Sequence, residues 1–322
     1  MIHRERIRTY LEKGYWNRRS RLLSRAGIRL SPGLSPDLTG RSVQGNNIPS
    51  RNLNSIQNAP SELDGLVRFV QEFKHAALIG CAVFGSFADG STTRYSDLDG
   101  IILIDLKRID RKKNSLRSLR NIISKTESQL LAIDALQHHG WHIVFTDDVD
   151  GNPHVIPTAT LGICFSLTTP FELPLYNNTL DRSAVLMYCQ RLNYAIERVN
   201  EACSLYSFKS ILSRFMLLPA LYLQATTGKQ ITKKESFETL RALMPGLNYS
   251  AMDMASAWRL NWSQPKPDDA GLKPRRTHIF PKTPQQPRCD YAIRMPEIRL
   301  WKQDATAFID SLIATLESGY QE

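Results

Sequence analysis

The sequence predicts an α+β protein in which a mixed β-sheet domain is followed by a helical bundle. Over residues 61–150, apolar runs of strand length alternate with amphipathic stretches, which is typical of a domain that mixes strands and helices. After Leu180, apolar residues recur at the three- and four-residue spacing of helices. We therefore expect a sheet-containing core at 61–175 and a helical domain at 176–322.

The first 60 residues are set apart by their charge. Residues 1–60 contain eleven Lys and Arg but only three Asp and Glu, a net charge of +8, whereas the rest of the chain has a net charge of only +2. Apolar residues at helical spacing predict a basic helix within 7–30, and the Ser-, Pro-, Gly- and Asn-rich stretch 31–60 predicts a loop or linker. We interpret this segment as a basic N-terminal arm. Such an arm suits a polyanion such as nucleic acid, and it is equally compatible with a solvated arm that has no ligand.

The elements of the core follow in order. Ser61-Glu62-Leu63-Asp64 is similar to a capping box and predicts the start of a helix. The apolar run 76–84 has the length of a strand and ends abruptly at Gly85, and a second apolar run covers 100–104. Further along, we expect a helix near 116–128 and two short strands at 130–133 and 141–145.

The second half of the chain predicts helices separated by short connections. We expect them over 182–204, 208–226 with a kink at Pro219, 235–244, 250–261 and 301–316. Residues 263–297 contain seven of the 17 prolines, so this stretch predicts a long irregular loop.

Composition excludes several classes of protein. With 322 residues, 42% of them hydrophobic and 22% charged, the chain is neither a collagen nor a coiled coil nor wholly disordered. No apolar run reaches the length of a membrane span, so we expect no membrane association. The five Cys form no CxxC pair, which argues against a disulfide framework and a Cys-based zinc site. We expect a cytoplasmic protein.

One segment has the chemistry of a phosphate-handling site. A strand that runs into Gly85-Ser86 exposes backbone N–H groups that can cradle a phosphate, and the Ser86 hydroxyl adds a donor. After ten intervening residues, Asp97 and Asp99 stand two apart at the head of the next strand, which places both carboxylates on one face. Paired carboxylates favour a hard divalent cation such as Mg²⁺. A phosphate cradle beside such a pair is what phosphoryl or nucleotidyl transfer requires.

This segment resembles the signature of the DNA polymerase β-like nucleotidyltransferase superfamily: an apolar residue, Gly-Gly or Gly-Ser, about nine to thirteen residues, then acid–apolar–acid–apolar. The matching residues here are Phe84, Gly85, Ser86, Asp97, Leu98 and Asp99. Gly100 departs from the pattern, because a larger apolar residue is usual there. The positions of Gly90 and Ser96-Asp97 are most similar to those of the small bacterial members. The resemblance covers 83–104 strictly, and it implies a nucleotidyltransferase core at 61–175.

The resemblance also implies a third carboxylate, which helps to hold the metal or takes the proton of the attacking hydroxyl. Asp134 is one candidate, because the stretch from Asp134 to Gly140 is similar to Asp-x-Leu-Gln-His-His-Gly runs of bacterial nucleotidyltransferase-like proteins. Asp147 and Asp148, after the 141–145 strand, are the competitors, and absence of a third acid is the remaining alternative. The nearby His138, His139 and His142 are interpreted as a structural turn or as a donor near the phosphates, rather than as a zinc site, because Gly140 interrupts their spacing.

The resemblance places further nucleotide contacts in Ser96 and in the helical domain. Members of the superfamily bring Lys and Ser from a helical domain onto the triphosphate. Lys209 and Ser213 lie four residues apart on one helical face and are the predicted pair, and the Lys-rich turn within 228–237 is a second candidate. Exposed lysines on an amphipathic helix are the alternative interpretation.

Together these residues predict a template-independent, Mg²⁺-dependent nucleotidyltransferase that moves a nucleoside monophosphate from an NTP to an acceptor hydroxyl. In this hypothesis Gly85 and Ser86 hold the phosphates, Asp97 and Asp99 bind Mg²⁺, and Asp134 completes the site. The basic N-terminal arm favours an RNA end as acceptor. A small molecule such as an antibiotic, a protein side chain or a second nucleotide are the alternatives, as is a catalytically silent nucleic-acid-binding module.

Overall fold

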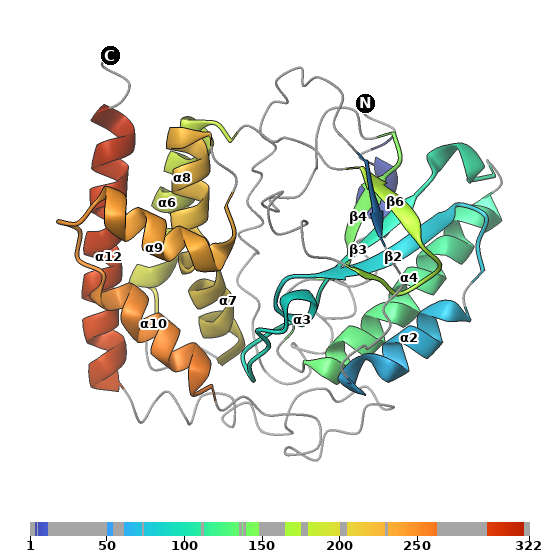
Figure 1. Ribbon diagram of the computed structural model, residues 1–322, viewed down its shortest axis with the longest axis horizontal. Coiled ribbons are helices and arrows are strands. Elements are labelled where there is room, and N and C mark those ends of the chain that lie inside the picture. Colours follow the sequence, from blue (N-terminus) through green and yellow to red (C-terminus); the bar gives the residue numbers. More distant parts are fainter. Residues whose placement is uncertain are drawn as a thin grey trace.

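The computed structural model consists of a sheet-containing half and a helical half that lie side by side (Figure 1). The residues it describes are 4, 6–11, 50–53, 61–72, 74–110, 113–134, 137, 140–147, 165–174, 180–199, 205–228, 231–262 and 295–318. The predicted combination of a mixed sheet with helices, in that order along the chain, is confirmed.

The central sheet has four strands in the order β4-β3-β2-β5. Its strands are β2 (Leu78–Phe84), β3 (Asp99–Ile104), β4 (His142–Phe145) and β5 (Phe165–Ser166). β2 runs antiparallel to β3 and β5, and β3 runs parallel to β4. The three strands predicted near 76–84, 100–104 and 141–145 are therefore present.

The two faces of the sheet are covered differently because successive side chains alternate between them. Cys81 and Val83 pack toward one face, with residues of α2 (Asp64–Gln71) and α4 (Lys113–Ile133). Ala82 and Phe84 pack toward the other, with residues of β6 (Phe171–Pro174), which pairs with β1 (Ser50–Leu53) in a separate two-stranded sheet. Both faces of β2 are buried, which explains its continuous apolar sequence.

The expected strand at 130–133 is wrong, because these residues form the last turn of α4. Leu119, Ile123 and Leu130 are all buried, and their spacing is that of one helical face. A short apolar run does not by itself distinguish a strand from the end of a helix. Asp134 consequently follows a helix instead of a strand, and its backbone N–H donates to the carbonyl of Leu130 at 3.0 Å.

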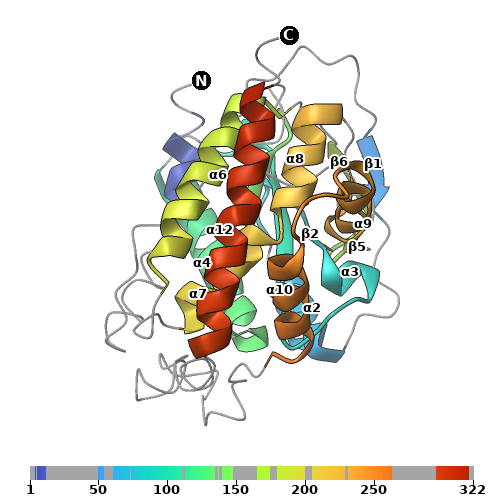
Figure 2. The same cartoon turned by 90° about the vertical axis from the view of Figure 1, so that its left-hand side faces the viewer.

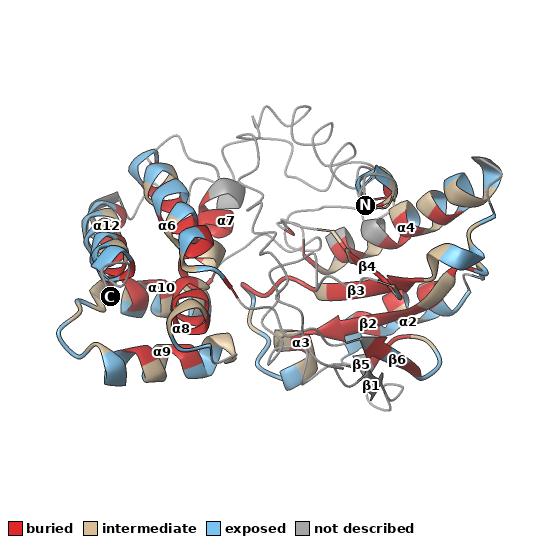
Figure 3. Ribbon diagram, turned by 90° about the horizontal axis from the view of Figure 1, so that it is seen from above, coloured by how far each residue is buried: buried red, intermediate tan, exposed pale blue. Residues whose placement is uncertain are grey.

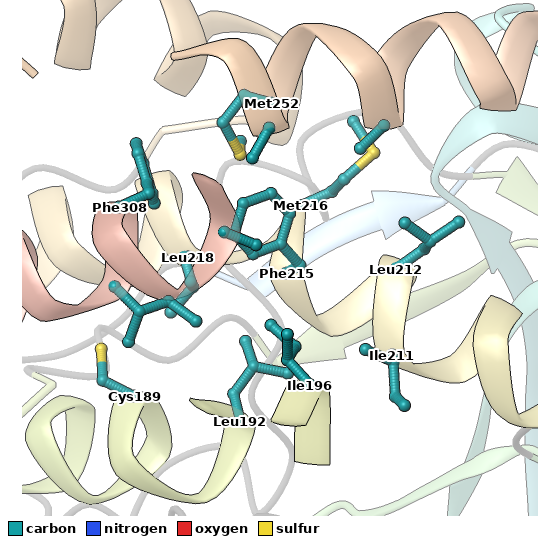
Figure 4. Packing of buried hydrophobic residues seen from close by; sticks show 14 of the residues in the cluster. Cys189, Leu192, Ile196, Ile211, Leu212, Phe215, Met216, Leu218, Met252 and Phe308 are labelled. Atoms are coloured by element: carbon teal, nitrogen blue, oxygen red, sulfur yellow. The ribbon is translucent and has the colours of Figure 1, made fainter. Parts of the chain in front are cut away.

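The helical half contains α6 (Arg182–Glu197), α7 (Leu205–Phe215), α8 (Leu218–Thr227), α9 (Lys233–Leu243), α10 (Ser250–Leu260) and α12 (Met295–Ser318). Figure 2 views this half from its outer side, where α6 and α12 run next to each other. The apolar side chains of these helices meet in one cluster, part of which is drawn in Figure 4.

The expected single helix over 208–226 is two helices, α7 and α8, which meet at residues 216 and 217. Pro219 lies in the first turn of α8. A proline is well tolerated there, because the first N–H groups of a helix have no partner within the helix. The chain breaks before the proline rather than bending at it. The predicted proline-rich loop falls mostly on residues outside those that the structure describes.

Part of the N-terminal segment packs into the core. Residues 6–11 are helical, and Leu11 is fully buried in the cluster beneath α2 and α4. Arg8 donates to the carbonyl of Ile143 at 3.3 Å, and its guanidinium lies 4.7 Å from the ring centre of Phe145. Arg4 forms an ion pair with Asp147 at 2.5 Å. Two of the arginines that suggested a free basic arm are thus engaged with the end of β4.

Within the described part of the chain, every helix is too short or too polar to cross a lipid bilayer.

Candidate active site

The site begins at the turn between β2 and α3 (Ser86–Asp89). Gly85 connects them with φ 69° and ψ −151°, a conformation that residues with a side chain rarely adopt. A Cβ atom at this position would lie 2.7 Å from Oδ2 of Asp99. The structure therefore brings the predicted Gly-Ser turn and the predicted carboxylate Asp99 directly together, and it does so through the missing side chain of Gly85.

The two aspartates lie at the start of β3 and just before it. Asp99 is its first residue and pairs with Phe84, whereas Asp97 precedes the strand and is buried. Gln137 holds Leu98, the residue between them. The Leu98 N–H donates to Oε1 of Gln137 at 3.0 Å, and Nε2 of Gln137 donates to the Leu98 carbonyl at 2.9 Å. This fully buried amide continues the hydrogen bonding of the strand and fixes the backbone that carries both carboxylates.

Gly100, the departure from the superfamily pattern, has a structural reason. A Cβ atom on Gly100 would lie 2.2 Å from the ring of Trp141. Trp141 is buried and precedes β4, which runs beside β3. The space beside Gly100 that a larger side chain would need is thus filled by the Trp141 indole ring.

A buried lysine from the helical half contacts two carboxylates of the sheet half. Nζ of Lys209, on α7, lies 2.6 Å from Oδ2 of Asp134 and 3.5 Å from Oδ1 of Asp97. The side chains of Lys209 and Asp134 are both 0% exposed, and that of Asp97 is 10% exposed. Opposite charges at such distances in a buried setting attract strongly. The predicted residues Asp97, Asp134 and Lys209 therefore meet in one ion-pair network.

The loop before β3 inserts Tyr95 into the helical half. Tyr95 is buried and belongs to the apolar cluster of the helices, where its ring meets that of Trp262 edge-on at 4.9 Å. Its hydroxyl donates to the Lys209 carbonyl at 2.9 Å and lies 2.6 Å from Oγ of Ser213. Burial raises the pKa of Tyr95 well above its ordinary range, so the hydroxyl keeps its proton. In Figure 3 the segment that leads into β3 is buried and reaches toward the helices.

Two further cations from the helical half face the same region. Lys233 is the first residue of α9, and Arg259 lies in the last turn of α10, 5.2 Å from the ring centre of Tyr95. Burial is the main cause of a lowered pKa at Lys233, and the charge of Arg259 lowers it further. Asp99 and Asp97 oppose that shift. All four groups are thus close enough to interact electrostatically.

The remaining predicted residues have other surroundings. Ser96 is buried and its Oγ accepts from the N–H of Thr93 at 3.0 Å, so its hydroxyl stabilises the turn before Asp97. Asp147 follows the far end of β4, whereas Asp99 lies level with the start of that strand. The five steps of β3 from Asp99 to Ile104, the partner of Phe145, span about 17 Å at 3.3 Å each. Asp148, His138 and His139 lie outside the described residues.

The three predicted carboxylates do not form one cluster. Among the described residues, no three His, Cys, Asp or Glu side chains gather closely enough to hold a metal ion. Asp97 and Asp99 both act electrostatically on Lys233, whereas the carboxylate of Asp134 is directed to Lys209. The roles of these residues in metal binding remain predictions.

Sequence reasoning missed Tyr95, Gln137 and Arg259. Gln137 lies in the Asp134–Gly140 stretch noted above. Its amide bonds the distant backbone of Leu98, and no sequence pattern predicts such a contact. Arg259 is one basic residue at the polar side of an amphipathic helix, where cations are common. Lys233 falls in the Lys-rich turn singled out at 228–237. Their positions in the folded protein, with Arg259 over the Tyr95 ring and Lys233 near Asp97 and Asp99, distinguish these cations from ordinary surface charges.

No protein-family model matches this chain, and neither does any curated protein.

Proposed function

We propose that this protein is a Mg²⁺-dependent nucleotidyltransferase. The observation that carries the proposal is that two acidic and two basic side chains lie in the same site. Asp97 and Asp99 stand two residues apart at the start of β3, and both act electrostatically on Lys233, whose pKa is also lowered by the charge of Arg259. Carboxylates beside lysine and arginine side chains form a site with a place for a cation next to a place for an anion. A divalent cation on the acids and a polyphosphate on the bases would balance both pairs at once.

The residues fit a divalent cation. The donor set is two carboxylates two residues apart, which is the hard oxygen chemistry that Mg²⁺ prefers. Oδ2 of Asp99 faces the side of Gly85 that lacks a side chain, and the Lys209 ammonium lies 3.5 Å from Oδ1 of Asp97, beyond normal hydrogen-bond distance. Bound there, Mg²⁺ would supply charge neutralisation for the reacting phosphates. Asp97 and Asp99 would hold it.

The residues of the helical half fit the phosphates. Nε of Arg259 is buried and lacks a hydrogen-bond partner among the described residues. Lys233 presents a second cation from the start of α9. Lys209 and Ser213, which the sequence predicts as nucleotide contacts, bond to Asp134 and Tyr95 instead. The proposal therefore assigns the triphosphate to Lys233 and Arg259, with Gly85 and Ser86 at the opposite side.

In the proposed reaction, an acceptor hydroxyl releases its proton to solvent water, and its oxygen bonds to the α-phosphorus of the NTP. The bond from that phosphorus to the β-phosphate oxygen breaks, and pyrophosphate leaves. Asp97 and Asp99 position the metal, and the cations of the helical half stabilise the negative charge on the leaving group. The Gln137 amide keeps the backbone at Leu98 fixed while this happens.

We propose an RNA end as the acceptor. The charge of the surface favours it: exposed basic side chains follow 3₁₀ helix η2 (Leu106–Arg108) and the outward side of α4. They are Lys107, Arg108, Arg117 and Lys125. Arg6 is also exposed, whereas Arg4 and Arg8 are used within the fold. Cationic rows of this kind attract phosphate backbones. A small molecule, a protein side chain or a second nucleotide are the alternative acceptors.

The proposal is tested with Mg²⁺, each α-³²P-labelled NTP and total RNA, comparing the wild type with the Asp97→Asn/Asp99→Asn variant. We expect label in RNA from the wild type and none from the variant, because the variant lacks the charges that hold the metal. Label in small products or in the protein band would replace RNA by another acceptor. No binding of any Mg²⁺-NTP by calorimetry, together with no incorporation, would contradict the proposal itself.

Lys233 offers a separate test on binding alone. Replacing it with glutamine should weaken Mg²⁺-ATP binding about tenfold or more, since a hydrogen bond to a charged group is lost. The adjacent Lys234 is exposed, so Lys234→Gln is a matched control that should bind as the wild type does. Calorimetric titration measures both.

The same titration has an expected pH dependence. Protonated Lys233 is the form that binds an anion, and burial lowers its pKa below that of an ordinary lysine. Affinity should therefore fall as the pH rises through this lowered pKa, before other lysines titrate. Lys233→Gln should lack that step, and an unchanged pH profile in the variant would argue against a phosphate contact.

A further inference from the structure

We infer that Asp134 is a positioning residue that controls the metal affinity of Asp97 through Lys209, instead of a third metal ligand. The inference rests on the proposed function in one respect, because it takes Asp97 and Asp99 as the metal ligands. It concerns a residue whose surroundings the sequence did not reveal.

The two distances from the Lys209 ammonium show that it interacts more strongly with Asp134 than with Asp97. The Lys209 ammonium lies 2.6 Å from Asp134 but 3.5 Å from Asp97. The shorter contact is a charge-assisted hydrogen bond, and the longer one is an ion pair beyond normal hydrogen-bond distance. Asp134 therefore binds most of the charge of Lys209 and keeps the ammonium away from the carboxylate that a metal would use.

Because Lys209 and Asp134 are buried, the loss of either partner has a large effect on the other. The Lys209 and Asp134 side chains are inaccessible to water, so the ammonium cannot exchange a lost partner for solvent. If Asp134 were neutral, the ammonium would still have the Asp97 carboxylate at 3.5 Å as an ionised partner. A cation at Asp97 would then have to compete with a buried lysine for the same oxygen atoms. The wild-type group of Asp97, Lys209 and Asp134 has a formal charge of −1, and neutralising Asp134 reduces it to zero.

The surrounding fold holds Asp134 in this role. Asp134 follows α4, and the Gln137 N–H donates to its backbone carbonyl at 3.1 Å. Gln137 in turn binds Leu98, between the two aspartates. One short segment thus fixes the backbone of the acidic pair through an amide and the lysine beside the pair through a carboxylate. A residue that acts on a ligand through another group affects metal affinity without touching the metal.

The test is Mn²⁺ binding to the full chain without nucleotide, measured from the electron paramagnetic resonance signal of free Mn²⁺. We expect Asp134→Asn to weaken Mn²⁺ binding about tenfold, the size typical of losing an outer partner of a ligand. The double variant Asp134→Asn/Lys209→Met should bind as tightly as the wild type or more tightly, because the competing ammonium is gone. Asp253→Asn, which removes a carboxylate of an exposed ion pair on α10, is the matched control and should change nothing.

The outcomes separate the two ideas. If Asp134 ligates the metal, the double variant will bind as weakly as Asp134→Asn, and the inference is overturned. It is also overturned if Asp134→Asn binds like the wild type. Asp97→Asn in the same assay tests the proposed function: if it retains Mn²⁺ binding, the assignment of the metal site fails whatever Asp134 does. Thermal unfolding of each variant confirms that the binding measurements refer to folded protein.

Discussion

Replacing Lys209 with methionine is expected to lower the free energy of unfolding by about 3–5 kcal/mol, the usual cost of removing one partner from a buried ion pair. The variant would leave the carboxylates of Asp134 and Asp97 close together, with the ammonium between them absent. Methionine fills most of the volume of the lysine stem, so the loss arises from charge and not from a cavity. Urea unfolding followed by fluorescence measures the change in midpoint.

Two control variants test whether the loss of stability in Lys209→Met arises from buried, unpaired charge. Adding Asp134→Asn to Lys209→Met removes one of the stranded charges and should recover a large part of the loss. Arg241→Met breaks the exposed ion pair with Asp253 and should cost less than about 1 kcal/mol, because surface ion pairs contribute little. Equal losses for Lys209→Met and Arg241→Met would mean that burial adds nothing to the Lys209 network.

Gly85→Ala is expected to lower transfer activity about 100-fold and to destabilise the fold by about 1–3 kcal/mol, the cost of a side chain in a conformation almost restricted to glycine. The added Cβ would also lie 2.7 Å from Oδ2 of Asp99, so the carboxylate has to move. A displacement of about 1 Å at a reacting centre costs roughly 100-fold in rate. Incorporation of labelled nucleotide and urea unfolding measure the two effects.

Gly90→Ala is the matched control. Gly90 also has a positive φ of 74°, but nothing lies within 4 Å of its hypothetical Cβ. Its ψ of 9° places it in the left-handed helical region, where alanine costs about 1–2 kcal/mol. Gly90→Ala should therefore lose stability but retain activity. If both variants lose activity equally, the close approach of Gly85 to Asp99 is not what the site requires.

The parts of the fold that the sequence predicted are those with a repeating pattern. Strand β2 and helix α6 could be assigned because burial on a strand or one side of a helix repeats along the chain. Residues 130–133 were misassigned because four apolar residues fit either structure. Strand β5 was not predicted at all: it has two residues, and its place beside β2 depends on pairing with Ala82 and Val83, 84 and 82 positions earlier in the chain.

In the candidate site, too, some residues could be predicted from the local sequence and others could not. Gly85, Ser86, Asp97 and Asp99 lie within fifteen residues of one another, so their spacing alone indicated a site. The cations that face them come from α7, α9 and α10, and nothing in the local sequence separates Lys233 from Lys234. Their difference arises from the packing of the helices against the loop before β3. A linear pattern carries no information about that packing.

The insertion of Tyr95 also sets an order for folding during synthesis. The carbonyl that its hydroxyl binds belongs to Lys209, 114 positions later in the chain. At about 5–20 residues per second, a ribosome takes roughly 6 to 23 s to add that many residues. Throughout this interval the phenol ring has no helical cluster to enter, and the neighbouring aspartates lack their lysine. The nascent sheet half therefore keeps the Tyr95 side chain exposed until the helical half around Lys209 has been synthesised. That loop is therefore accessible to chaperones while the rest of the polypeptide is still being made.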